Sequence, residues 1–75
     1  MGKLNKERMQ RLTDIVQSLE RSGKKVNRRG LEAQLVVNYG LETKAASKEV
    51  AALIDSGKLK SSIEEGVEVV WYEQG

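Results

Sequence analysis

The side chains that could carry chemistry in this sequence of 75 residues are carboxylates, hydroxyls and basic groups, because it contains no histidine and no cysteine. Those two residue types supply the usual zinc ligands, the imidazole general bases and the thiol nucleophiles. The adjacent carboxylates Glu64 and Glu65 lie in a predicted solvated turn, where nothing would raise a pKa for general acid catalysis. The glycines are spaced too widely for a glycine-rich phosphate loop. We therefore expect neither an enzyme nor a bound metal or cofactor.

Basic residues are concentrated in the first part of the chain. Residues 1–30 hold nine lysines and arginines against three acids, whereas the remainder holds four lysines against eight acids. A basic segment suits a polyanion such as nucleic acid, while the acidic remainder argues against indiscriminate coating of it. The alternative interpretation is a plain solvated surface laced with ion pairs.

The chain has no apolar run of the length that a membrane span needs, and no apolar stretch follows the charges near the N-terminus. We expect no membrane partner and an intracellular location, cytoplasmic or nuclear. At this length the sequence predicts a single domain over residues 1–75, with an ordered core over about residues 5–73.

The first predicted helix covers residues 5–22, where apolar residues recur at intervals of three and four. Asn5 is placed to cap its start and Gly23 to end it. The apolar stripe also fits a short heptad seam, but core packing is favoured because two heptads are few for a coiled coil. The stripe consists of Met9, Leu12, Ile15, Val16 and Leu19.

Two further helices are predicted after a short extended link at residues 24–26. Asn27 is placed to cap a helix that runs to about Tyr39, and Gly40 is suited to end it in a left-handed conformation. Thr43 is placed to cap a third helix over residues 44–56. The apolar spacing predicts that the inward face of this helix consists of Ala46, Val50, Leu53 and Ile54.

The end of the chain changes to the composition of strands. Residues 59–63 and 67–72 are rich in β-branched and aromatic types, and Glu64-Glu65-Gly66 between them predicts a hairpin turn with glycine at positive φ. Trp71 is predicted to fill the core, with an exposed stacking platform for nucleic acid as the alternative. The predicted fold class is α+β, a three-helix bundle with a C-terminal β-hairpin.

The stretch from Gly40 to Leu59 resembles the turn and recognition helix of a winged helix-turn-helix domain. In that family a glycine ends the second helix and a small polar residue caps the third. Small residues let the two helices approach, and a glycine precedes the first strand of the wing. All four features occur in this order here, and with the flanking segments the resemblance covers roughly residues 5–73. It implies a winged helix whose third helix enters the major groove of duplex DNA.

The resemblance implies a DNA interface on the third helix and on the basic start of the second. Arginines and backbone N–H groups at a helix start suit phosphate oxygens. The outward face of the third helix has no Arg, Asn or Gln for bidentate base contacts, so low sequence specificity is expected, as for a transcriptional regulator or a DNA-associated accessory protein. The candidate DNA-binding residues are Lys24, Lys25, Asn27, Arg28, Arg29, Thr43, Lys44, Ser47, Lys48 and Lys60.

The predicted wing departs from the DNA-binding pattern of the family because Glu64, Glu65 and Glu68 make it acidic. The alternative function is therefore a protein-interaction module that docks a partner through the acidic wing or the edge strand. The two hypotheses differ in surface charge. A continuous positive patch on the third helix favours DNA, and a patch interrupted by Glu42, Glu49 and Asp55 favours a protein partner.

Overall fold

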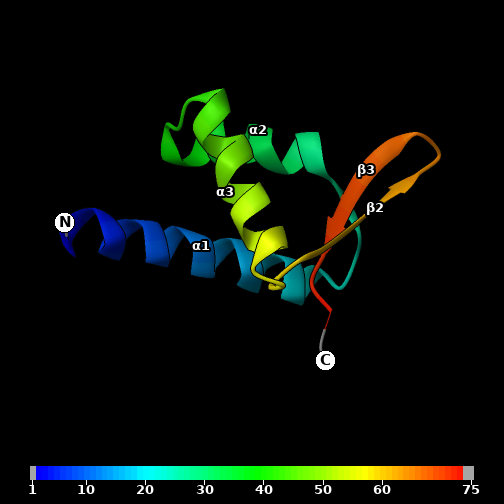
Figure 1. The fold of residues 1–75 in the computed structure, drawn as a ribbon, viewed down its shortest axis with the longest axis horizontal. Helices are drawn as coiled ribbons and strands as arrows, with labels where there is room; N and C mark the ends of the chain where they lie inside the picture. Colours follow the sequence, from blue (N-terminus) through cyan, green and yellow to red (C-terminus); the bar gives the residue numbers. More distant parts are fainter. Residues whose placement is uncertain (1, 74–75) are drawn as a thin grey trace.

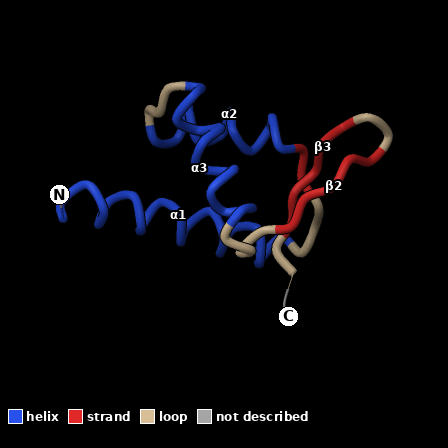
Figure 2. Tube along the Cα trace, in the orientation of Figure 1, coloured by secondary structure: helices blue, strands red, loops and turns tan. Residues whose placement is uncertain are grey.

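The structure is a computed structural model that describes residues 2–73. It contains three helices and a three-stranded antiparallel sheet, which confirms the predicted α+β class (Figure 1). Figure 2 shows the helices gathered on one side of the molecule and the strands on the other. The elements are α1 (Gly2–Ser22), β1 (Val26–Asn27), α2 (Arg28–Tyr39), α3 (Thr43–Asp55), β2 (Lys60–Glu64) and β3 (Val67–Trp71).

The sheet has the strand order β1-β3-β2, so the last strand lies between the other two. Of the predicted extended link, only Val26 lies in a strand, since β1 consists of Val26 and Asn27, with Val26 opposite Val70. The β2–β3 hairpin extends away from the helices (Figure 1). Its two-residue turn has positive φ at both positions, 54° at Glu65 and 78° at Gly66, as the tight hairpin turn that suits the twist of strands requires.

The core lies where the three helices meet the sheet. The predicted inward face of α3 is confirmed, since Ala46, Val50 and Leu53 are buried and Ile54 packs against them half-buried. The other buried apolar residues in the described part of the chain are Ile15, Leu19, Leu31, Leu35, Leu59 and Val70. The hydrophobic patterns of the helices therefore identify most of the core.

The predicted packing of Met9 against this core is wrong, and Tyr39 also lies largely outside the core. The side chain of Met9 is 65% exposed, because that part of α1 extends beyond the other helices (Figure 1). Tyr39, in the last turn of α2, is 41% exposed and lies beside the guanidinium of Arg11, 6.0 Å from its ring centre. Met9 continues the helical spacing of the apolar stripe, but the neighbouring elements do not reach far enough to cover it.

The predicted helix ends are confirmed at both ends of α2 and at the end of α1, where Gly23 has φ 64°, whereas the predicted caps at the starts of α1 and α3 are wrong. The side-chain oxygen of Asn27 accepts hydrogen bonds from the backbone N–H groups of Arg29 (2.8 Å) and Gly30 (3.4 Å), and Gly40 ends α2 with φ 68°. Asn5 lies inside α1, because the preceding residues, which include the strong helix formers leucine and lysine, continue the helix to its start at Gly2. Thr43 is the first residue of α3, one position too late to cap it.

Trp71 does not fill the core, contrary to prediction. Side chains alternate along a strand, and since Val70 is buried, Trp71 lies on the outer face of the sheet, where it is half-buried. Its indole N–H donates to Glu73 (3.3 Å), and the ammonium group of Lys25 lies 4.5 Å from the ring centre. Tyr72, the next residue, packs against the core in its place.

Candidate nucleic-acid interface

The N-terminal half of α3 presents a basic face. Lys44 and Lys48 are exposed, Ser47 between them is half-buried, and Thr43 is exposed at the first position of the helix. Both lysines stand one turn apart near the positive end of the helix dipole, where their charges and that of the dipole have the same sign. This face is therefore electropositive and carries no bulky apolar side chain.

The acid nearest to this face is turned into the protein. Glu49 is 6% exposed and accepts hydrogen bonds from Nε of Arg11 at 2.8 and 3.0 Å, with a further close contact from Nη2. The hydrogen bond to Glu49 raises the pKa of Arg11 above its ordinary value, so the guanidinium stays charged at every physiological pH. Three acids, Glu42, Glu49 and Asp55, could interrupt a positive patch on α3. Only Glu42 and Asp55 are exposed, at opposite ends of the helix.

Sequence reasoning missed the Arg11–Glu49 pair, although a signal for it exists. Glu49 follows Ala46 by three positions and precedes Leu53 by four, so it falls on the apolar stripe of α3. A carboxylate on such a stripe needs a buried cation as its partner. Only the crossing of α1 and α3 identifies Arg11 as that cation.

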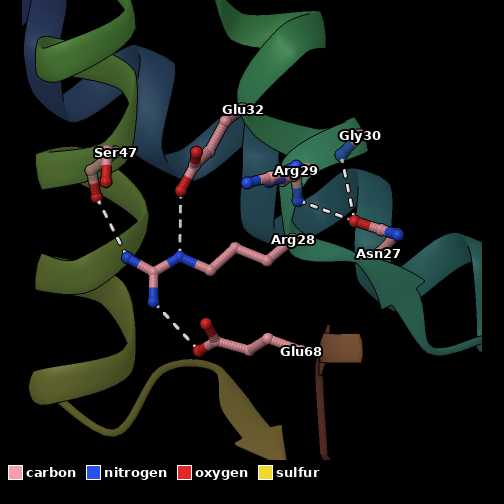
Figure 3. Close-up of polar contacts among 7 residues, drawn as sticks. All are labelled: Asn27, Arg28, Arg29, Gly30, Glu32, Ser47 and Glu68. Atoms are coloured by element: carbon pink, nitrogen blue, oxygen red, sulfur yellow. Dashed lines mark hydrogen bonds and ion pairs between the residues drawn. The ribbon is translucent and has the colours of Figure 1, made fainter. Parts of the chain in front are cut away.

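Arg28, a predicted phosphate-binding residue, makes its hydrogen bonds within the protein (Figure 3). Its guanidinium donates to Glu32 in α2 at 2.9 Å, to Glu68 in β3 at 2.9 Å and to the carbonyl of Ser47 in α3 at 3.4 Å. Burial by itself lowers the pKa of Arg28. The hydrogen bonds to Glu68 and Glu32 outweigh this effect, so the pKa lies above its ordinary value. Arg28 therefore links three elements and has two carboxylates as partners in place of a phosphate.

A cleft of about 600 Å³ lies between the start of α2, the face of α3 and the β2–β3 hairpin. Arg29, next to Arg28, is exposed at this cleft, and its backbone N–H is held by Asn27. Four of the predicted site residues line the cleft. Asn27, Arg28 and Arg29 lie at the start of α2, and Ser47 lies on α3. The cleft is lined by Asn27, Arg28, Arg29, Glu32, Ser47, Gly66, Val67 and Glu68.

The remaining predicted cations are not part of this cleft. Lys25 donates to Glu64 at 2.6 Å and covers the ring of Trp71, and Lys60 pairs in register with Trp71 in the sheet. Hydrogen bonds from Lys25 and Ser62 lower the pKa of Glu64 from its ordinary value. Lys24 is exposed in the loop before β1. These lysines therefore flank the sheet, and one acid of the β2–β3 hairpin, Glu64, is already neutralised by an ion pair.

Comparisons with models of protein families, with curated proteins and with solved structures gave no match to this chain. Among residues 2–73 there is no group of three or more carboxylate, imidazole or thiol side chains that could hold a metal ion. No helix in the described part of the chain combines the length and the apolar character needed to cross a membrane.

Proposed function

We propose that this chain is a winged-helix domain that binds duplex DNA with low sequence specificity, with α3 in the major groove and the start of α2 on the phosphate backbone. The order of elements supports this proposal, since a helix, a short strand, two helices and a hairpin occur in the sequence typical of a small winged helix. The pairing of β1 with β3 is compatible with it as well. A transcriptional regulator or a DNA-associated accessory protein fits such a domain.

The observation that carries the proposal is the basic face in the first half of α3, which the exposed acid Glu42 precedes at the helix start. Lys44 and Lys48 are exposed on it, and Glu49, the acid that would oppose them, is paired with Arg11 in the interior. Short side chains on this face allow close approach to the groove, and the two lysines supply the charge that phosphates attract. The hydroxyl groups of Thr43 and Ser47 are available donors to the DNA backbone.

Arg29 is the proposed phosphate contact at the start of α2, because Arg28 is occupied by Glu32 and Glu68. Its guanidinium is exposed beside the cleft that separates α3 from the wing. Lys24 and Lys60 add to the positive potential around the sheet, while the charge of Lys25 is balanced by Glu64. Docking of a protein through the acidic wing has less support, because Glu64 and Glu68 are bound by Lys25 and Arg28.

The test is a fluorescence anisotropy titration of random-sequence duplex DNA at about 50 and about 200 mM salt, where each phosphate contact contributes about −0.9 to the slope of log K against log salt. The double variant Lys44→Glu, Lys48→Glu is expected to lose nearly all binding and to stay folded. Lys6→Glu, Arg8→Glu is the matched control, because it reverses two exposed charges on α1. Equal losses in both variants, or no binding by the wild type at the lower salt, would contradict the proposal.

A further inference from the structure

The hairpin leaves one strand of the sheet with an open edge. In the order β1-β3-β2, strand β2 pairs with β3 on one side, and no strand among residues 2–73 pairs with it on the other. An edge strand of five residues presents a row of backbone N–H and C=O groups that a further strand can pair with. Ile63 on this strand is 71% exposed, an apolar side chain that the protein leaves uncovered.

The turn determines which backbone groups lie on the open edge. The two residues that flank a two-residue hairpin turn, here Glu64 and Val67, form a hydrogen-bonded pair across the two strands. Because an antiparallel ladder alternates, the backbone groups of Ser62 and Lys60 also face β3. Those of Ser61 and Ile63 therefore point outward from the sheet.

The sequence of β2, Lys-Ser-Ser-Ile-Glu, is complementary in charge to itself when it is reversed. A second copy placed antiparallel about a two-fold axis at Ser62 brings Lys60 opposite Glu64 of that copy, and Ser61 opposite Ile63. The outward backbone groups of Ser61 and Ile63 then meet as hydrogen-bonded pairs. Lys60 and Glu64 meet as a non-hydrogen-bonded pair, in which opposite side chains lie closest.

We propose that β2 is a self-association edge, which binds the β2 strand of a second copy of this chain and joins the two sheets into one of six strands. Opposite charges meet twice in this arrangement, and Ile63 is covered on each copy. The intramolecular bonds do not prevent it, because Lys25 and Ser62 both bind Oε2 of Glu64, and Oε1 has no hydrogen-bond partner among the described residues. Since one short strand pair buries less than a standard interface, the dimer is transient.

Charge reversal tests the pairing of Lys60 with Glu64. Sedimentation velocity is measured without DNA at protein concentrations from about 10 μM to about 1 mM. The wild type is expected to form dimers reversibly over this range, because a small interface gives weak association. Lys60→Glu and Glu64→Lys, each alone, place like charges opposite each other twice and are expected to weaken the dimer about tenfold. An equimolar mixture of these two variants is expected to restore it, because every pair is then of opposite sign.

A backbone test distinguishes strand pairing from simple charge attraction. Ile63→Pro removes an N–H that points to the open edge without removing a hydrogen bond to β3, so the variant is expected to fold but not to dimerise. Ile63→Ala keeps that N–H and is the matched control, expected to retain most of the association. Circular dichroism establishes that both variants are folded.

The outcomes that overturn the inference are separate from those that concern DNA. A wild type that stays monomeric at the highest concentration contradicts it, as do failure of the mixed variants to associate and dimers of the Ile63→Pro variant. Association only with an added extended peptide would assign the edge to another protein. The variant Lys44→Glu, Lys48→Glu is expected to dimerise like the wild type, because its changes lie on α3.

Discussion

Arg11 and Arg28 both bind carboxylates, but in different surroundings. The Arg11–Glu49 pair joins α1 to α3 in the interior, with side chains that are 18% and 8% exposed. Arg28 joins α2, α3 and β3 beside the open cleft, where its partner Glu68 is 36% exposed. The first pair removes an acid from the face of α3, and the second set removes a base from the start of α2. The surface that a ligand meets thus differs from the charge counted along the sequence.

The two sites also differ in what supports the charges. Only 8% of the Glu49 side chain is exposed, so its charge depends mainly on the two-point contact with Arg11. The groups around Arg28 are closer to solvent, and water can replace part of what a lost partner supplied. We therefore expect stability to depend more strongly on Arg11 than on Arg28.

The largest effect is expected from Arg11→Leu, which leaves the Glu49 carboxylate buried without a partner. The expected loss is about 3–5 kcal/mol of unfolding free energy, a large part of the stability of a domain of this size. Glu49→Leu should cost less, because Arg11 can turn to solvent. The double variant Arg11→Leu, Glu49→Leu should be more stable than Arg11→Leu alone. Denaturant titrations of all three measure this, and a loss below about 1 kcal/mol for Arg11→Leu would show that water reaches Glu49.

A smaller loss is expected from Arg28→Ala. This change removes the hydrogen bonds that join β3 to α2 and α3, and the carboxylates left behind are partly solvated, so about 1–2 kcal/mol is expected. The measurement is again a denaturant midpoint at constant slope. If Arg28→Ala proved as damaging as Arg11→Leu, the contrast between the interior and the cleft would be lost.

The neighbouring substitution Arg29→Ala should leave stability within about 0.5 kcal/mol of the wild type, because its side chain is exposed. It is expected to weaken binding to all duplexes alike and to reduce the salt slope by about one contact. Titrations of two unrelated duplexes at several salt concentrations provide the measurement. An unchanged slope would place Arg29 outside the interface.

The smallest effect on stability is expected from a change in the Lys25–Glu64 pair, because both side chains are exposed. The pKa of Glu64 lies below its ordinary value of 4.5. The pair therefore stabilises the fold fully at pH values above 4.5, and this stabilisation is lost as the pH falls through the lowered pKa. Glu64→Gln should therefore be slightly less stable than the wild type near about pH 7 and indistinguishable from it near about pH 2. Thermal unfolding at both pH values compares the two proteins, and a difference that persists in acid would point to a cause other than this carboxylate.

The local patterns of the sequence were sufficient to predict the three helices, the hairpin and the α+β class. Asn27 and Gly40 mark the ends of α2 by their own backbone and side-chain chemistry, and Gly66 marks the turn in the same way. The spacing of Ala46, Val50 and Leu53 predicts the buried face of α3, because helical period needs no knowledge of what lies opposite.

The contacts that shape the candidate interface could not be predicted in this way. The pairing of Arg11 with Glu49 joins residues 38 positions apart, and that of Arg28 with Glu68 joins residues 40 apart. Both depend on the angles at which separate elements cross, which no local spacing records. The outward position of Trp71 has the same origin, since the register of β3 against β1 and β2 and the placement of Val70 against the helices determine which face of the strand is buried.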